Sequence, residues 1–278
     1  MTQTVDVDAF VRFEAAGWRR AGLGDAYHRF FGPITAWAVE PLLDAAAVGP
    51  GTRTLDVATG PGYVAGRAAA RSADTIGVDI APEMVAIAQR LWPDVAFRTA
   101  DAHALPFDDQ RFDAVVANFL VPHLGDHPRA ASEFVRVLAP GGRLALSTWD
   151  HPERVALLGI VMEAVRLAGA QPPADLPAGP DFFRFADDAA FAALLRETGL
   201  AEVTVQRVGF THRVKSAAEL WDGVIDGSVR TAALVRGQPD DVQRQIRVAF
   251  DHLVARYRAD DGLELPVSVK IAAGVRPT

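Results

Sequence analysis

A glycine turn between two acidic residues is the feature of this chain best suited to chemistry. Gly60 and Gly62 begin a G-x-G-x-x-A pattern that ends at Ala65, Asp56 lies four residues before Gly60, and Asp79 lies 19 residues after it. Small residues let the backbone approach a ligand, a helix N-terminus offers free N–H groups, and the second acid can accept hydrogen bonds from ribose hydroxyls. The spacing therefore predicts a site for a nucleoside-containing cofactor.

Alternating strands and helices must position this turn. Residues 54–58 form a short apolar strand, 63–71 an Ala-rich helix and 75–79 a second strand. A further helix is expected from Pro82 to Leu91, where a proline is well tolerated in the first turn. This order is typical of a βαβ mononucleotide-binding unit. Two more helices are expected upstream, over residues 8–20 and 33–47, from their apolar spacing.

The residues around the turn decide between two interpretations. The glycine pattern alone also fits a nicotinamide-dependent oxidoreductase, but such turns normally carry apolar residues where this chain has Asp56. Residues 55–62, Leu-Asp-Val-Ala-Thr-Gly-Pro-Gly, resemble motif I of the class I S-adenosylmethionine (SAM)-dependent methyltransferases, with Ala58 in place of the first glycine. The resemblance implies that Asp56 meets the α-ammonium of SAM, directly or through water. The alternative is that Asp56 only caps the turn.

Three later segments continue the resemblance. Residues 94–107 are similar to the family's third strand and its G-D-A-x-x-L-P-F continuation, with Ala100 replacing glycine. Residues 112–118 are typical of a parallel strand buried on both faces. The run 133–142 resembles the E-h-x-R-V-L-x-P-G-G of small-molecule methyltransferases, and 143–149 would be the fifth strand. The closest resemblance is to the branch that includes the ubiquinone/menaquinone biosynthesis C-methyltransferases.

The resemblance implies the fold and its division. We expect an α/β, Rossmann-like seven-stranded sheet of order 3-2-1-4-5-7-6, with the last strand antiparallel and helical lid insertions. The expected parts are an N-terminal helical cap over 1–50, a SAM-binding core over 51–150, a lid and core helix over 151–200, and sheet-completing strands over 201–278 with a helical insertion at 216–259.

The resemblance also implies the cofactor contacts. Asp79 would bind the ribose, Asp101 would accept from the adenine amino group, and the Ala102 N–H would donate to the ring. Tyr27 would cover SAM and Met84 would pack on the adenine, with plain core packing as the alternative for both. The full expected set is Tyr27, Asp56, Ala58, Thr59, Gly60, Asp79, Ile80, Met84, Asp101, Ala102, Asn118 and Phe119.

Residues that follow the fourth and fifth strands should lie at the carboxyl edge of the sheet, where ligands bind. His123 is the candidate general base, because the ordinary histidine pKa of ~6.5 suits proton removal at neutral pH. A structural histidine bonded to a backbone carbonyl is the alternative. Trp149, Phe183 and Arg184 are the candidate substrate residues. For the aromatic cluster at 182–185 the alternative is a hydrophobic staple that anchors the next helix, which we favour for Phe185. Two further histidines are assigned no role, since we expect His103 on the surface and His127 in a turn.

Composition excludes several other classes. The 278 residues contain no cysteine, which removes thiolate catalysis and Cys-ligated metals, and the net charge of −7 argues against a nucleic-acid partner. No run approaches the ~20 apolar residues of a membrane helix. Residues 1–8 carry two acids and no base, unlike a targeting peptide, so we expect a cytoplasmic protein. No carboxylate is suitably placed for a catalytic metal after the fourth strand.

The sequence therefore predicts a SAM-dependent methyltransferase that acts on O, C or N of a small, apolar or aromatic metabolite. We expect a monomer or homodimer without nucleic-acid, membrane or metal partners. A SAM-binding, cyclase-like enzyme that does not methylate is the main alternative. A non-catalytic regulatory or scaffold protein is another.

Overall fold

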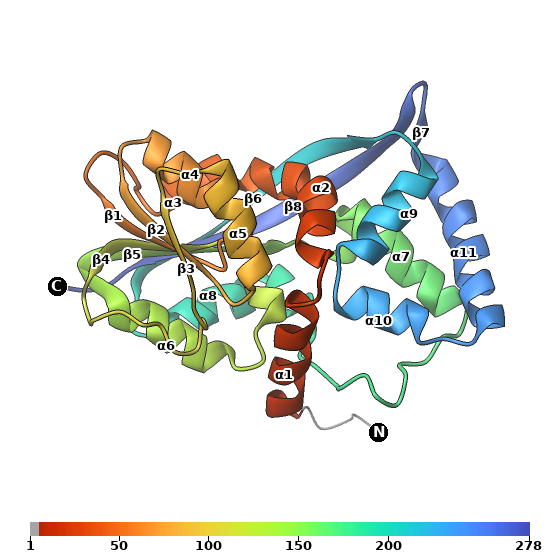
Figure 1. The fold of residues 1–278 in the computed structure, drawn as a ribbon, viewed down its shortest axis with the longest axis horizontal. Helices are drawn as coiled ribbons and strands as arrows, with labels where there is room; N and C mark the ends of the chain where they lie inside the picture. The colour runs from red at the N-terminus through yellow and green to blue at the C-terminus, as the bar shows by residue number, and fades with distance from the viewer. Residues whose placement is uncertain (1–5) are drawn as a thin grey trace.

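The strands of this chain form one mixed sheet of order β3-β2-β1-β4-β5-β8-β6 (Figure 1). They are β1 (Arg53–Val57), β2 (Asp74–Asp79), β3 (Ala96–Thr99), β4 (Phe112–Ala117), β5 (Leu138–Trp149), β6 (Ala201–Val214), β7 (Arg258–Ala259) and β8 (Gly262–Val275). The strands β1 to β5 are parallel, and β8 runs antiparallel to β5 and β6. The predicted order is confirmed, because β8 takes the place of the seventh strand and the short β7 only pairs with β8.

The computed structural model describes residues 6–278. Residues 1–5 belong to the expected N-terminal cap and to the segment expected to carry no targeting signal, and they lie outside the described residues. In the described part of the chain, no helix combines the length and the apolar character needed to cross a bilayer.

Helices cover both faces of the sheet because its central strands are apolar on both sides. On β4, Ala114 and Val116 pack in a cluster with α3 (Val39–Ala45) and α4 (Tyr63–Ala70). Val115 and Ala117 pack in another with α6 (His127–Val137) and α8 (Asp188–Arg196). On the first face, α5 (Pro82–Leu91) packs beside α4 over β3. The carboxyl ends of β1, β2 and β4 are thereby held rigidly at one edge.

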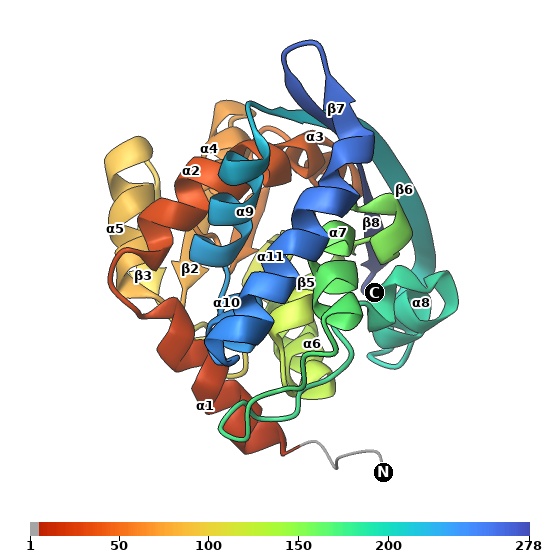
Figure 2. The same cartoon turned by 90° about the vertical axis from the view of Figure 1, so that its right-hand side faces the viewer.

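A second apolar core lies beyond that edge, around the extended ends of β6 and β8. Figure 2 shows the helices that build it, seen from their own side. They are α2 (Leu23–Thr35), α7 (Ala156–Leu167), α9 (Ala217–Asp226), α10 (Arg230–Arg236) and α11 (Asp240–Val254), with α1 (Val7–Trp18) beside them. Helix α9 crosses α2 very closely at Gly223, where a Cβ would lie 2.1 Å from the Phe30 ring. Helix α2 and the late insertion therefore pack together beyond the edge of the sheet, whereas α3 packs on the face of the sheet.

Local structure departs from expectation in three places. The helix expected over 33–47 is divided between the end of α2, a 3-10 turn (Ala36–Ala38) and α3. Helix α6 begins at His127, whereas the apolar pattern predicts a helix over residues 132–138, because the Asp126 side chain caps it by accepting from the Arg129 N–H. His127 is consequently a buried residue of the first helical turn, not a turn residue. Strands β6 and β8 are longer than the strands that the sequence predicts over residues 202–208 and 266–275, since they pair with each other along their lengths.

Candidate functional site

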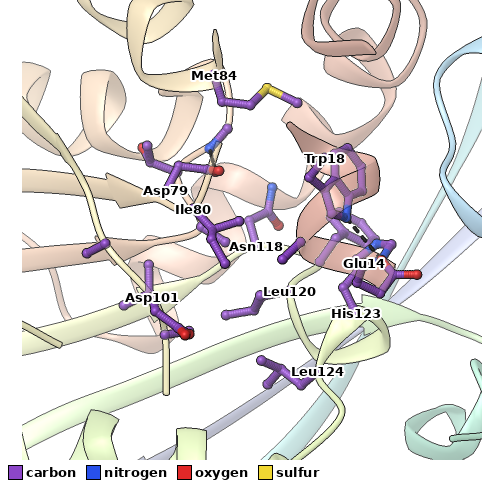
Figure 3. A pocket seen from close by; sticks show the side chains of 18 of the residues that line it. Glu14, Trp18, Asp79, Ile80, Met84, Asp101, Asn118, Leu120, His123 and Leu124 are labelled. Carbon is purple, nitrogen blue, oxygen red and sulfur yellow. Dashed lines mark hydrogen bonds and ion pairs between the residues drawn. The ribbon is translucent and has the colours of Figure 1, made fainter. Parts of the chain in front are cut away.

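The carboxyl ends of β1, β2 and β4 open onto a cavity, which we call the strand-end cavity (Figure 3). It contains about 1060 Å³ of empty space, counted out to its open mouth. Its walls come from the turn after β1, the end of β2 with the start of α5, residues 100–103, residues 118–124, and helices α1 and α2.

Asp79 joins the end of β2 to the glycine turn. Its Oδ2 accepts from the Gly60 N–H at 2.8 Å and its Oδ1 accepts from the Ala81 N–H at 2.9 Å. Burial raises the pKa of Asp79, and these backbone donors oppose that rise. Gly60 adopts φ +53°, and nothing lies within 4 Å of the place where its Cβ would stand. The turn thus offers open space beside a carboxylate whose oxygens each have a lone pair left for a further donor.

Asp56 lies behind the cavity wall and is completely buried. Its Oδ2 accepts from the Thr59 hydroxyl at 2.6 Å and from the Ala65 N–H at 3.1 Å, which is the capping arrangement. Its Oδ1 has no hydrogen-bond partner among the described residues. Burial raises the pKa of Asp56 to about 7, against the two hydrogen bonds that lower it. A buried carboxylate with one unused oxygen favours a cationic or donor group nearby.

The structure brings most of the predicted cofactor residues together. The lining of the strand-end cavity includes Tyr27, Ala58, Thr59, Gly60, Asp79, Ile80, Met84, Asp101, Ala102, Asn118 and Phe119. Tyr27 packs in parallel with Phe31, their ring centroids 5.4 Å apart, and burial raises the pKa of its hydroxyl to about 12. The hydroxyl of Tyr27 therefore stays protonated and is not a base.

The polar loop after β4 is tied to both of its neighbours. The Asn118 amide donates to the carbonyl of Thr35 at 3.2 Å and accepts from the Ser147 hydroxyl at 2.6 Å. Phe119 follows in the left-handed region, at φ 57°, and its N–H donates to the Ser147 Oγ. A bulky residue in this conformation is strained, and such strain concentrates at functional sites. The conformation places the Phe119 ring 4.2 Å from the ring of Trp149.

His103 was expected on the surface, and the structure places it in the cavity wall. Its side chain is 11% exposed, and Nδ1 lies 2.9 Å from Oδ1 of Asp101. This contact with His103 holds the pKa of Asp101 below its usual value, even though burial opposes the shift. Nε2 of His103 is buried and has no partner among the described residues. His103 is thus a polar residue of the wall that sequence reasoning missed.

A second cavity adjoins the first, and we call it the helix-walled cavity. It contains about 930 Å³ of empty space, and its walls come from α1, α2, α7, α9, α10 and the segment around Phe182. Trp149 and Phe183 line it, whereas Arg184 is exposed and does not. Four residues line both cavities: Trp18, Tyr27, Phe119 and His123. The two spaces therefore meet at an aromatic junction.

His123 stands at this junction beside a buried acid. Its Nδ1 lies 3.0 Å from Oε2 of Glu14, and Trp18 Nε1 donates to the same oxygen at 3.1 Å. The Glu14 side chain is 6% exposed and that of His123 is 26% exposed. Trp18 also packs edge-on against the His123 ring, at 5.1 Å (Figure 3). A carboxylate at Nδ1 favours the tautomer whose Nε2 is a free acceptor.

Sequence reasoning had not assigned Glu14 or Trp18 to the site. Glu14 lies four residues after Phe10 and four before Trp18, so all three share one face of α1. An acid on an otherwise apolar helix face was the available signal. Among residues 6–278, no cluster of three or more His, Cys, Asp or Glu side chains is arranged to hold a metal ion.

Comparison with known proteins agrees with this geometry. A Rossmann-like sheet with a nucleoside-sized cavity at its carboxyl edge defines a class of cofactor-dependent α/β enzymes. Residues 55–146 match the methyltransferase domain family. The chain is 34% identical over 165 residues to the demethylmenaquinone methyltransferase of Beutenbergia cavernae, across 56% of this chain and 69% of that protein. The chain therefore belongs to the class I SAM-dependent methyltransferases, whose cofactor is SAM.

Other relatives match over a smaller part of their length. The demethylmenaquinone methyltransferase of Renibacterium salmoninarum is 37% identical over 111 residues, which is 40% of this chain and 47% of the relative. The first curated relatives are thus spanned over about half their length. Among solved structures, the YcgJ protein of Bacillus subtilis has a TM-score of 0.57 at 20% identity, covering 87% of this chain and 98% of its own. That likeness concerns the fold alone.

The residues present fit SAM. The unused Oδ1 of Asp56 suits the α-ammonium side of the cofactor, and Asp79 beside the open Gly60 turn suits its ribose. Met84, Asp101 and His103 also line the strand-end cavity, and an apolar side chain beside polar groups suits a nucleoside base.

Proposed function

We propose that this chain transfers the methyl group of SAM to an oxygen, carbon or nitrogen atom of a small, apolar or aromatic molecule. The observation that carries this proposal is that the two cavities meet at His123, whose Nδ1 contacts the Glu14 carboxylate. One cavity suits the cofactor, and the other is walled by Phe31, Phe119, Trp149 and further aromatic and aliphatic side chains. The demethylmenaquinone methyltransferase names of the relatives support an apolar ring system as substrate.

The cofactor residues of the proposal are those of the strand-end cavity. Asp79 would receive the ribose hydroxyls, Asp101 and Ala102 the adenine, and Asp56 would act on the ammonium from behind the wall. Tyr27 and Phe119 would separate the cofactor from the substrate and exclude water from the junction. When bound, SAM supplies an activated methyl group on a sulfonium, so the protein mainly positions and deprotonates the acceptor.

His123 would accept the proton that the acceptor loses. Its Nε2 makes no hydrogen bond within the described residues, while its Nδ1 is held by Glu14. Glu14 would orient the imidazole and stabilise the cation that forms when Nε2 takes the proton. Glu14 is therefore a positioning residue, and Trp18 holds Glu14 in turn.

Formation of S-adenosylhomocysteine tests the proposal. The protein is incubated with SAM and a panel of phenols, hydroxynaphthoates and reduced naphthoquinones, and both products are followed by mass spectrometry. With an accepted substrate, His123→Ala should lower kcat by about 10²- to 10³-fold and leave the Kd for SAM unchanged. His252→Ala, on the exposed side of α11, is the matched control and should behave as wild type.

Two results would count against the proposal. SAM binding without S-adenosylhomocysteine formation from any member of the panel would contradict methyl transfer to this substrate class. An unchanged kcat in His123→Ala would remove the histidine from the mechanism.

A further inference from the structure

The helix-walled cavity has one polar corner in an otherwise apolar lining. Most of its lining residues are aromatic or aliphatic, but Ser228, Arg230 and Thr231 gather where α9 gives way to α10. Besides His123 at the junction, Arg230 is the only basic residue among the described residues of this lining. A cation in an apolar cavity needs an explanation, because burying a charge without a counter-ion is unfavourable.

Arg230 has no carboxylate partner in the described part of the chain. It is half-buried, and within residues 6–278 no acid lies within 4.0 Å of its guanidinium. Its Nη1 donates to the carbonyl of Pro177 at 2.8 Å, and its guanidinium carbon lies 5.6 Å from the Phe10 ring centroid. Burial lowers the pKa of Arg230, against the opposing field of Glu14. The Glu14 carboxylate already accepts from Trp18 Nε1 and contacts His123 Nδ1.

Ser228 gives a second, independent indication in the same corner. Its Oγ is buried and makes no hydrogen bond to any described residue. A hydroxyl can both donate and accept, and a buried one is almost always paired. The unused hydroxyl and the guanidinium without a carboxylate partner are two residues apart, and both residues belong to the lining of the helix-walled cavity.

We propose that Ser228 and Arg230 bind the carboxylate of an amphipathic substrate, so that the methyl acceptor is an aromatic organic acid. This inference rests on the proposed function, because it takes the helix-walled cavity as the substrate site. One guanidinium and one hydroxyl match a single carboxylate, and the apolar remainder of the wall matches a ring system. The acid group would lie at the α9–α10 corner while the nucleophilic atom faces His123 at the junction.

Binding of a charged and a neutral probe of the same shape tests this inference without any turnover. The probes are 2-naphthoate and 2-naphthamide, titrated calorimetrically into the full chain with and without S-adenosylhomocysteine. We expect the naphthoate to bind at least about tenfold more tightly than the amide, as for a charge-assisted hydrogen bond. S-adenosylhomocysteine should not displace it, since the cofactor occupies the other cavity.

Substitutions test whether the preference for naphthoate over naphthamide arises from Ser228 and Arg230. Arg230→Gln should remove the preference for naphthoate and leave the affinity for naphthamide within about twofold, and Ser228→Ala should weaken naphthoate binding alone. Arg236→Gln is the control on the same helix, because Arg236 pairs with Asp226 outside the cavity lining. Naphthamide binding also shows that each variant is folded.

Three results would overturn the inference: no naphthoate binding up to millimolar, a charge preference that survives Arg230→Gln, or displacement of naphthoate by S-adenosylhomocysteine. None of these depends on methyl transfer. A failure here is therefore distinguishable from a failure to form S-adenosylhomocysteine in the assay above.

Discussion

Glu14 and His123 are 109 residues apart in the sequence, and their side chains meet at 3.0 Å. The contact joins the first helix of the chain to the loop after β4, and both residues line the strand-end cavity. Helix α1 is consequently part of the site and not only a cover over it. Substitutions at this pair test whether His123 acts as the base and Glu14 as its positioning residue.

Glu14→Gln should lower kcat by about tenfold or more and leave the KM for SAM unchanged, because the imidazole loses its orienting carboxylate. Glu14→Asp retains the charge and should recover part of the loss. Trp18→Phe keeps the ring and removes one donor to Glu14, so its effect should be smaller. Steady-state kinetics of the three variants check this, and a rise in KM with unchanged kcat would show that Glu14 only shapes the cavity.

Asp56 should make SAM binding dependent on pH. Burial raises its pKa to about 7, so at pH 6 the unliganded carboxyl is mostly protonated. A cation nearby favours the carboxylate, so SAM affinity should rise between about pH 5.5 and 7.5, and binding at pH 6 should release close to one proton. Calorimetry in buffers of different ionisation enthalpy measures that release.

Asp56→Asn should abolish this proton release and weaken SAM binding. Asp79→Asn is the control for the second buried carboxyl, whose pKa burial also raises. Equal proton release in wild type and Asp56→Asn would show that Asp56 serves the turn alone.

Gly60→Val should leave the protein folded and abolish SAM binding, because the valine side chain fills the open space beside the turn. The left-handed φ of +53° adds a strain of about 1–2 kcal/mol. Gly169→Val is the matched control: it has φ +64°, equally open surroundings and a place outside both cavity linings. Thermal unfolding with SAM titration should show similar destabilisation in both variants and lost binding in Gly60→Val only.

Ala58→Gly should stabilise the protein by about 0.5–1 kcal/mol, because relief of left-handed strain outweighs the extra entropy of glycine. Ala58 has φ 55° where the family motif has its first glycine. Urea unfolding measures the gain, and a destabilised Ala58→Gly would show that the alanine methyl contributes packing that offsets its strain.

The expected cofactor residues around the glycine turn could be predicted from the sequence because they lie close together along the chain. The turn at Gly60 and the acid at Asp79 lie within one strand–helix–strand unit, so their spacing alone brings them together, as the 2.8 Å contact shows. The sheet order, in contrast, was expected only because the ordered motifs resemble those of the methyltransferase family, and the structure confirms it. A strand–helix–strand pattern determines where its own turn and its own acid lie relative to each other.

The proposed substrate cavity is lined by helices that are distant in the sequence, and no short sequence pattern predicts how such helices pack together. Arg184 was selected because it sits among phenylalanines, yet it is exposed and stacks on Phe185 outside the cavity. Arg230 has no such neighbours in sequence, and its contacts in the structure are with Pro177 and Phe10, which are distant in the chain. Glu14 could not be assigned to the site from the sequence either, because its partner His123 is 109 residues away. Its position on an apolar helix face was the one feature that could have indicated a role.

The family match covers residues 55–146, whereas the helix-walled cavity takes only Phe119 and His123 from that range. Mutations that reshape the proposed substrate wall would therefore fall mostly outside the residues that the family model matches. Descendants of one ancestor can diverge in the molecules they accept while their matched core hardly changes. Relatedness judged on residues 55–146 alone is, for this architecture, chiefly a record of the shared methyl donor.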